Sequence, residues 1–211
     1  MIRFIYADSL AASPKLASTM FRDRAVQFKE RLKWEVSVDG QGFERDQYDD
    51  MNPLYVIWQR EDGSHGGSMR FLPTVGRTMV NDHFLELTGG VRIVSPLIWE
   101  CTRFCLAPEL GDQAHRIAAG LMLAGCEMGL RFGLEHSVGV FDARMVRIYR
   151  SIGWSPEIVG TGGEGRDRIS MGLWEFSIQA KLGVAAKARI SPREAESWFE
   201  VSFPRRVSKV A

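Results

Sequence analysis

The sequence predicts an α/β protein, an α+β sandwich in which helices flank a central mixed, twisted sheet. Short apolar segments typical of strands alternate with longer segments whose apolar residues recur every three or four positions, as on one face of a helix. The chain has 211 residues, which is enough for one sizeable core. Hydrophobic residues make up 45% and charged residues 25% of it, a balance that is ordinary for a globular protein.

The first expected elements are a strand over residues 2–7 and a helix over residues 14–33. Ser13 can cap the start of this helix, and Pro14 suits the first helical position because the N–H that it lacks would have no partner there. Residues 35–53 are rich in Gly, Asp and Asn and predict a long loop. Loops of that length are usually functional or disordered.

The sheet is expected to continue with a hairpin. Residues 54–59 and 67–72 have strand patterns and flank a turn at residues 61–63. Two further strands are predicted at residues 91–95 and 97–106. Together with the first strand, these segments supply one half of the expected sheet.

The clearest helix covers residues 113–132, where apolar residues recur on one face. A buried strand at residues 137–141, a helix at 143–151 and a late strand at 169–178 follow. Residues 191–194, Ser-Pro-Arg-Glu, form a capping box that predicts a terminal helix.

Composition restricts the possible partners and the environment. The formal net charge is +1, so no overall field favours nucleic acid or a membrane surface. Three cysteines without a CxxC pair and four scattered histidines predict no disulfide framework and no metal site. The N-terminus lacks the apolar region of a signal peptide, and no apolar run approaches the ~20 residues of a membrane span.

We expect a cytoplasmic monomer with one main domain, residues 1–185, and a C-terminal helical appendage, residues 186–211.

Several charged residues occupy positions where neutral ones are easier to bury. These residues are Arg24, Asp46, Asp49, Arg70, Glu100 and Arg103. Charges in core strands are rare unless they are paired, because desolvation is costly for each ion. Three arginines and three carboxylates would balance if they met in one cleft. In isolation, Arg24 and Glu100 are more often structural ion-pair partners.

The same residues belong to a series of ordered motifs. The series reads Met20-Phe21-Arg22-x-Arg24-x3-Phe28, Trp34, Asp46-x-Tyr48-Asp49, Arg70-Phe71-Leu72-Pro73-Thr74 and Glu100-x2-Arg103-Phe104. Over roughly residues 1–175 it resembles the LuxI-type acyl-homoserine-lactone synthases, or autoinducer synthases. The resemblance implies a GNAT-like N-acyltransferase fold, with a V-shaped cleft between two central strands that holds a phosphopantetheine arm.

The resemblance also implies an activity. Such an acyltransferase joins an acyl thioester to S-adenosyl-L-methionine and releases an N-acyl-L-homoserine lactone, a quorum-sensing signal, with 5′-methylthioadenosine. S-adenosylmethionine is then a substrate, and no cofactor is expected. Generic acetyltransferases hold the pyrophosphate of coenzyme A on a glycine-rich loop at a helix N-terminus. Residues 108–115 lack that loop and carry two carboxylates, so an acyl carrier protein is favoured over CoA as the donor.

Site residues follow from their positions in the motifs. Glu100 is the candidate base for the substrate amine, with Arg103 as its catalytic partner. The S-adenosylmethionine site is expected to contain Arg24, Phe28, Trp34, Asp46, Asp49, Arg70 and Phe104. The acyl pocket is expected to contain Trp99, Gly139, Phe141 and Met145. Carrier-protein docking is assigned to Arg144, Arg147 and Arg150, although such a row is usually a solvated helix face.

Three local expectations concern single positions of the predicted sheet. Glu100 and Arg103 would face opposite sides of a regular strand, so a joint role requires a β-bulge or a break between them. Gly139 stands where relatives that prefer 3-oxo acyl groups carry a threonine, so we expect no 3-oxo requirement and extra space beside the acyl chain. The alternative for Gly139 is tight strand–helix packing. Cys101 and Cys105 are interpreted as small core residues.

Other functions remain open at this point. One alternative is a CoA-dependent GNAT N-acyltransferase that acts on another amine. Another is a non-catalytic ligand-binding module on the same fold, which the charges on core strands disfavour. The sequence does not define acyl length, oxidation or branching.

Overall fold

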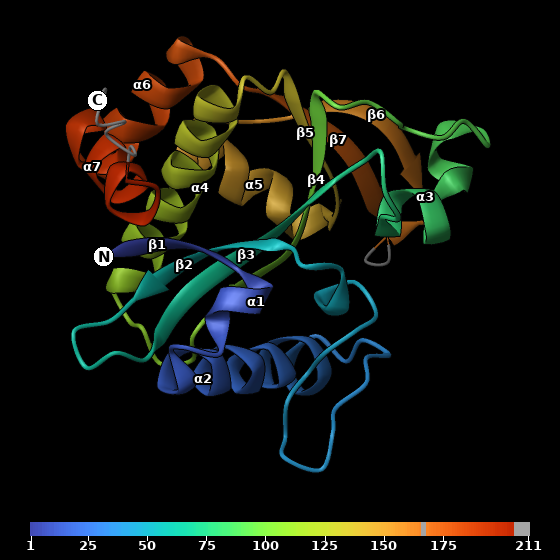
Figure 1. The fold of residues 1–211 in the computed structure, drawn as a ribbon. Helices are drawn as coiled ribbons and strands as arrows, with labels where there is room; N and C mark the ends of the chain where they lie inside the picture. Colours follow the sequence, from blue (N-terminus) through green and yellow to red (C-terminus); the bar gives the residue numbers. More distant parts are fainter. Residues whose placement is uncertain (166–167, 205–211) are drawn as a thin grey trace, which may run out of the picture.

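A computed structural model describes residues 1–165 and 168–204 (Figure 1). Its centre is a seven-stranded sheet with the order β1-β2-β3-β4-β5-β7-β6. The strands are β1 (Ile2–Tyr6), β2 (Leu54–Gln59), β3 (His65–Pro73), β4 (Ile98–Leu106), β5 (His136–Asp142), β6 (Glu157–Gly162) and β7 (Ile169–Glu175). Neighbouring strands are antiparallel except β4 and β5, which are parallel. The expected mixed sheet with flanking helices is therefore confirmed.

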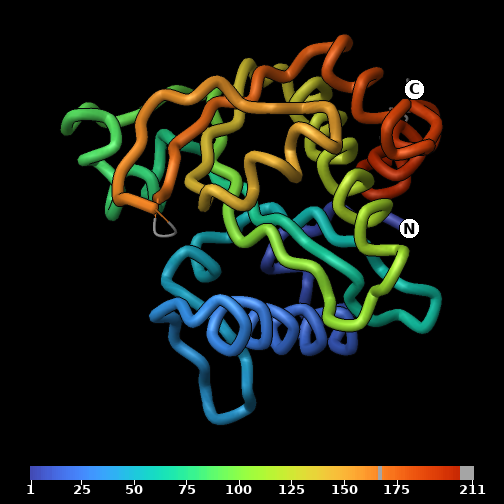
Figure 2. The backbone as a smooth tube through the Cα atoms, turned by 180° about the vertical axis from the view of Figure 1, so that it is seen from behind, coloured from blue at the N-terminus to red at the C-terminus, as the bar shows by residue number. Residues whose placement is uncertain are grey.

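Helices cover both faces of the sheet. The helix α2 (Pro14–Arg24) lies on one face of β3, and α4 (Gln113–Phe132) lies on the other face of β2 and β3 (Figures 1 and 2). The helices α5 (Ala143–Ile152), α6 (Ile178–Ala188) and α7 (Pro192–Ser202) pack beside α4. The short helices are α1 (Ala7–Leu10), η2 (Asp49–Met51), α3 (Met79–His83) and η3 (Leu85–Thr88).

Strand periodicity divides the core between the two faces. Val56 in β2 belongs to the large cluster under α4, whereas its neighbours Tyr55 and Ile57 belong to a smaller cluster under α2. Successive side chains of a strand point to opposite faces, so each strand serves both clusters. The charged residues of β3 and β4 can therefore face α2 while the apolar core stays with α4.

The first long helix differs from its predicted form. Pro14 begins it as expected, but the Ser13 side chain makes no capping hydrogen bond. The α-helix ends at Arg24, and a π-helix, η1 (Ala25–Arg31), continues the segment. The Leu32 N–H donates to the Gln27 carbonyl at 3.0 Å, which closes one wide turn. π-Helical turns are rare and are often found at functional sites.

Two parts of the predicted sheet are wrong. The predicted strand at residues 91–95 is irregular, and the Asn81 side chain bonds both backbone groups of Ile93, at 2.7 and 2.8 Å. A side-chain amide thus replaces the strand partner that this segment lacks. The late strand ends at Glu175, and Ile178 already begins α6 because the Ser177 hydroxyl accepts from the Ala180 N–H at 3.1 Å.

The C-terminal segment is tied to the main body. The division expected after residue 185 falls within α6, and α7 packs on β1 with Phe199 at 5.3 Å from Phe4 between ring centroids. The predicted terminal helix is present, although the Ser191 side chain makes no capping bond. Residues 205–211 of the expected appendage lie outside the described residues. Across residues 1–165 and 168–204, no helix has the length and apolar character needed to cross a membrane.

The central parallel pair opens partway along its length. β4 and β5 pair only at Ile98–His136, Trp99–Ser137 and Glu100–Val138. β4 nevertheless continues to Leu106 and β5 to Asp142. The two strands therefore part beyond Glu100, as expected for the V-shaped opening of an N-acyltransferase fold.

Candidate active site

An ion network lies between α2 and the sheet. Its arginines come from α2, β3 and β4, and its carboxylates all come from the segment between η1 and β2, in which Asp49 begins η2. The six residues of the ion network are Arg24, Glu44, Asp46, Asp49, Arg70 and Arg103. Five of them were expected to meet from their motif positions, and the structure brings those five together.

Each carboxylate of the ion network bridges two arginines. Glu44 lies 2.6 Å from Arg24 Nε and 3.0 Å from Arg103 Nη2. Asp49 lies 2.8 Å from Arg24 Nη2 and 2.9 Å from Arg70 Nη1. Three positive and three negative charges alternate, which offsets the cost of burying them.

Asp46 completes the alternation between the two strand arginines. Its carboxylate lies 3.0 Å from Arg70 Nη2 and 2.7 Å from Arg103 Nη2. Burial opposes ionisation of Asp49, but the charge and hydrogen bonds of Arg24, with further help from Arg70, hold its pKa well below the usual range.

The third carboxylate is not the residue that the sequence indicated. Glu44 completes the charge balance, whereas Glu100 stays outside the ion network. Glu100 instead accepts from the Met79 N–H at 3.1 Å and the Val80 N–H at 2.6 Å, at the start of α3. The only sequence signal for Glu44 is its place two residues before Asp46 in the same polar loop.

A β-bulge brings Arg103 to the face of the ion network. Arg70 pairs with Thr102, and Ser68 pairs with Cys105, so β4 carries one extra residue between these pairs. Arg103 has φ 54°, in the left-handed region that few non-glycine residues adopt. Such a conformation costs ~1–3 kcal/mol and is typical of functional sites. The irregularity expected for a joint role of Glu100 and Arg103 is confirmed.

Glu100 has the electrostatic properties of a proton acceptor near neutral pH. Burial raises its pKa to about 7, against the two amide hydrogen bonds from Val80 and Met79 that favour the ionised form. A carboxyl group that titrates near the working pH is suited to general-base catalysis. Its role as the base stays a prediction.

Two expected aromatic residues lie together beside the ion network. Phe28 and Trp34 stack with ring centroids 5.2 Å apart and an interplanar angle of 11°. The Arg103 guanidinium carbon lies 5.4 Å from the Phe28 ring centroid. Trp34 is 43% exposed, so its outer face is open to a ligand ring. Phe104 is half-buried on β4.

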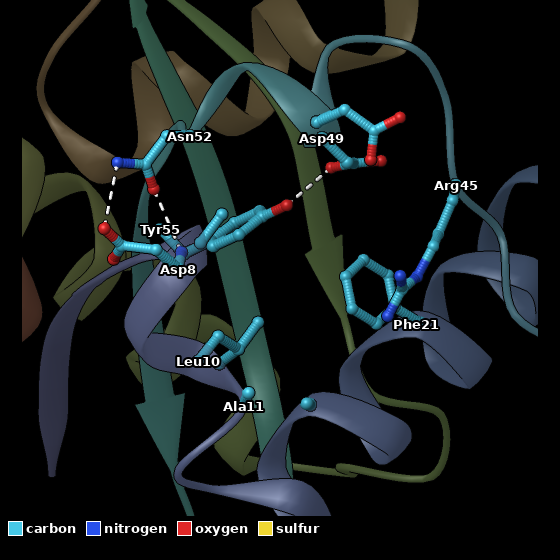
Figure 3. A pocket seen from close by; sticks show the side chains of 11 residues that line it. Asp8, Leu10, Ala11, Phe21, Arg45, Asp49, Asn52 and Tyr55 are labelled. Atoms are coloured by element: carbon cyan, nitrogen blue, oxygen red, sulfur yellow. Dashed lines mark hydrogen bonds between the residues drawn. The ribbon is translucent and has the colours of Figure 1, made fainter.

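A cavity of about 360 Å³ lies between α1, α2 and the 45–52 segment, with Asp49 of the ion network in its wall (Figure 3). Tyr55 forms part of its wall and donates to Asp49 at 2.6 Å. Arg45 lies over the Phe21 ring, 4.1 Å from its centroid (Figure 3). The sequence did not indicate this cavity, because its wall combines side chains from separate segments.

The residues expected for the acyl pocket lie on the α4 side of the sheet. Trp99 packs on Phe132 with centroids 5.6 Å apart, and Phe141 packs on Tyr149 at 5.2 Å. Met145 borders the same large cluster. This face is aromatic and apolar, in contrast to the face that carries the ion network.

The extra space expected at Gly139 is absent. A Cβ atom there would lie 2.9 Å from the Cys101 carbonyl oxygen and 3.4 Å from the Trp174 ring. Glycine permits a close approach of β4 to β5 at the point where the strands part. The alternative of tight packing is therefore correct, but the close contact is with a strand and not with a helix.

The arginines of α5 point to solvent. Arg144, Arg147 and Arg150 are exposed, and Arg144 pairs with Asp142 at 2.6 Å. Arg147 and Arg150 form no ion pair with any residue that the structure describes. Their role in carrier docking stays a prediction.

The cysteines lack the features of reactive groups. Burial raises the pKa values of Cys101 and Cys105, so a thiolate nucleophile is disfavoured at either position. Within residues 1–165 and 168–204, no cluster of three His, Cys, Asp or Glu side chains is suited to hold a metal ion.

The family model described as autoinducer synthase matches residues 8–176. This chain belongs to the autoinducer synthase family. An acyl-homoserine-lactone synthase of Rhizobium etli is 39% identical over 181 residues, which cover 84% of this chain and 85% of the relative. An acyl-homoserine-lactone synthase of Agrobacterium fabrum is 33% identical over 148 residues, which cover 67% of this chain and 69% of that protein.

Solved structures support the fold of this autoinducer synthase. The CoA-dependent acyl-homoserine lactone synthase BjaI, solved with SAM and isopentyl-CoA, gives a TM-score of 0.79 at 21% identity and covers 90% of both chains. An acyl-CoA N-acyltransferase of Pseudomonas aeruginosa gives a TM-score of 0.55 at 13% identity, over 82% of this chain and 98% of that one. The autoinducer synthase is an acyltransferase with a GNAT-like fold, and its relatives support acyl-homoserine-lactone synthesis as its activity.

Proposed function

We propose that this autoinducer synthase transfers an acyl group from an acyl carrier protein to S-adenosylmethionine and then closes the lactone ring. The observation that carries the proposal is the buried ion network beside Glu100, at the point where β4 and β5 part. Charges held in this way bind and orient a small zwitterionic substrate. S-adenosylmethionine is a substrate in this scheme, and the scheme requires no cofactor.

In the first step, the substrate amine attacks the thioester carbonyl carbon and the carbon–sulfur bond breaks. The α-amino group has a pKa near 8 and must lose a proton to attack. Glu100 accepts that proton, directly or through a water, and the leaving thiolate takes up a proton as the thiol departs. Beyond Glu100, the β4 amides that face β5 have no ladder partner, so they are available to stabilise the oxyanion.

In the second step, the substrate carboxylate oxygen attacks the carbon next to the sulfonium sulfur. The carbon–sulfur bond breaks, and 5′-methylthioadenosine leaves as the lactone closes. This step has its own leaving group and depends mainly on positioning. Asp46 holds the ammonium group, an arginine holds the carboxylate, and Phe28 and Trp34 contact adenine or the sulfonium.

The segment before α4 favours a carrier protein as the acyl donor. Glu109 and Asp112 are exposed there, and Asp112 makes no capping hydrogen bond. Two carboxylates at a helix N-terminus repel the pyrophosphate of CoA. The exposed Arg147 and Arg150 on α5 suit an acidic carrier surface.

A comparison of two donors tests this proposal. With S-adenosylmethionine present, we expect kcat/KM for an octanoyl carrier protein to exceed that for octanoyl-CoA at least ~10-fold. The double variant Arg147→Glu with Arg150→Glu should lose activity with the carrier protein and keep it with CoA. Arg193→Glu, an exposed charge reversal on α7, is the matched control.

The outcomes separate the alternatives. A preference for octanoyl-CoA would overturn the choice of donor, and some solved relatives are CoA-dependent. Failure to form a lactone with either donor, together with acylation of another amine, would support a different N-acyltransferase. Mass spectrometry of extracts from cells that express the chain, compared with control cells, shows whether the product is an acyl-homoserine lactone.

We further propose that the enzyme is a cytoplasmic monomer. The three cysteines are free thiols, which suits a reducing compartment. All residues assigned to catalysis, binding and docking lie between Arg24 and Arg150, so residues 1–185 are proposed to carry the reaction. Light scattering of the purified protein tests the oligomeric state.

A further inference from the structure

The two arginines on the sheet direct hydrogen-bond donors at a single side chain, Met79. Arg103 Nη1 donates to Met79 Sδ at 3.5 Å, and Arg70 Nη2 donates to the same sulfur at 3.6 Å. Among the residues that the structure describes, Arg103 Nη1 has no other hydrogen-bond partner. Met79 thus stands where two positively charged groups converge.

This sulfur is the weakest acceptor around the two arginines. Their other donors end on the carboxylates of the ion network or, for Arg70 Nε, on the Thr102 hydroxyl at 3.0 Å. A thioether accepts hydrogen bonds poorly, whereas a carboxylate bound by a guanidinium forms short bonds that are roughly twice as strong as neutral ones. A carboxylate that arrives between Arg70 and Arg103 therefore gains more than Met79 loses.

We propose that Met79 Sδ occupies the position of the substrate carboxylate, and that the carboxylate of S-adenosylmethionine displaces it from Arg70 and Arg103. The inference rests on the proposed function, since it names the subsite for one group of that substrate. The other donors of Arg70 and Arg103 are directed at carboxylates of the ion network or at Thr102, so the two that reach Met79 are the ones that a substrate carboxylate would take over. Methionine is unbranched and flexible, so its side chain can withdraw without a change of backbone.

Met79 also connects this subsite to the candidate base. Its backbone N–H donates to Glu100 Oε2 at 3.1 Å, and the next amide, that of Val80, donates to Oε1 at 2.6 Å. The substrate carboxylate thus binds beside the residue whose amide fixes Glu100. The amine of the same substrate is attached one carbon from that carboxylate, which places it near Glu100.

The binding of two nucleosides distinguishes a role of Met79 at the carboxylate subsite from a role in packing alone. S-adenosylhomocysteine carries the amino-acid carboxylate, whereas methylthioadenosine lacks it. Calorimetry on the wild type and on Met79→Gln should show S-adenosylhomocysteine binding at least ~10-fold more weakly to the variant, because an amide oxygen is a stronger competitor for the arginine donors. Methylthioadenosine should bind both proteins within about twofold.

Met79→Leu is the matched control for shape. It has similar volume and removes the acceptor, so S-adenosylhomocysteine should bind this variant at least as tightly as the wild type. In turnover assays, Met79→Gln should raise KM for S-adenosylmethionine and leave KM for the acyl donor unchanged.

The inference is overturned if Met79→Gln weakens both nucleosides equally, which would indicate packing, or if it weakens neither. A wild-type protein that binds neither nucleoside would contradict the proposed function itself. The two failures are therefore distinguishable in one set of titrations.

Discussion

The two faces of the central sheet carry opposite chemistry. Toward α2, the sheet presents the buried ion network, in which each charge is paired. Toward α4, it presents an aromatic and apolar cluster that includes Phe141 and Trp174, with ring centroids 5.5 Å apart. The proposed function places the small charged substrate on the first face and the acyl chain on the second. β4 and β5 part beyond Glu100, and this opening connects the two faces of the sheet. Both substrates of the proposed reaction can meet there.

The two faces should respond differently to substitution. A paired charge leaves an uncompensated partner when it is removed, whereas a volume-conserving swap between apolar side chains leaves the packing nearly intact. Substitutions on the α2 face are therefore expected to lower the free energy of unfolding more than conservative substitutions on the α4 face.

The largest effect is expected when one member of the ion network is removed. Arg24→Met leaves Glu44 and Asp49 buried without a main partner, and this should lower the free energy of unfolding by ~3–5 kcal/mol. Met128→Leu in the apolar core is the control, with a loss below ~1.5 kcal/mol. Urea unfolding measures both. Equal losses would show that the faces do not differ in this respect.

Glu100→Gln is expected to lower lactone synthesis at least ~100-fold, because it removes the proposed base and keeps the shape. The variant should remain folded, which circular dichroism checks. Near-normal turnover of the purified variant would place the base elsewhere and leave Glu100 as the anchor of α3.

The pH dependence of Glu100 gives an independent test. Because its pKa is raised to about 7, activity should rise with pH through about 7 as the carboxyl group ionises. Stability should change in the opposite direction. The folded protein holds this proton more tightly than the unfolded chain, so Glu100 should destabilise the fold as pH rises from about 4.5 to about 7, by up to ~3 kcal/mol. Glu100→Gln should remove that slope from unfolding curves.

Ligand binding should protect the loop that supplies the three carboxylates. Trypsin and other proteases are expected to cut within residues 35–52 in the free enzyme. When the concentration of S-adenosylmethionine or methylthioadenosine is about ten times its Kd, cleavage should slow ~10-fold if the form that is cut cannot bind the ligand. Equal cleavage with and without ligand would contradict the placement of the nucleoside beside Trp34.

The smallest effect is expected on the acyl side. Matched donors that differ only at carbon three should compete within about tenfold, since an apolar pocket discriminates weakly. Gly139→Thr should not create a 3-oxo preference, because its Cβ would meet the Cys101 carbonyl at 2.9 Å and force β4 and β5 apart. A wild-type preference above about tenfold for the 3-oxo donor would require a hydrogen-bond donor elsewhere in the pocket.

Local patterns were enough for much of the fold. The helix at Gln113–Phe132 begins and ends at the predicted residues, because its apolar period and its terminal Gly133 are local signals. Arg70 in a strand and Glu100 with Arg103 in another marked the side chains that need compensation. The bulge at Arg103 was predicted from the odd spacing of Glu100 and Arg103 together with their expected joint role.

Tertiary structure decided which groups meet. Glu44 and not Glu100 completes the ion network, because the loop that carries Glu44 folds over the sheet while α3 takes Glu100. Met79 has no distinguishing feature in the sequence, yet it receives donors from two strands. The glycine at position 139 predicted extra space beside the acyl chain, but the backbone of β4 occupies that space. Periodicity and capping depend on neighbours along the chain, so most helices and strands and the charged candidates could be predicted from the sequence. Pairing across segments depends on packing in three dimensions, so the partners of these charges, the irregular segment at residues 91–95 and the π-helix η1 became evident only in the folded protein.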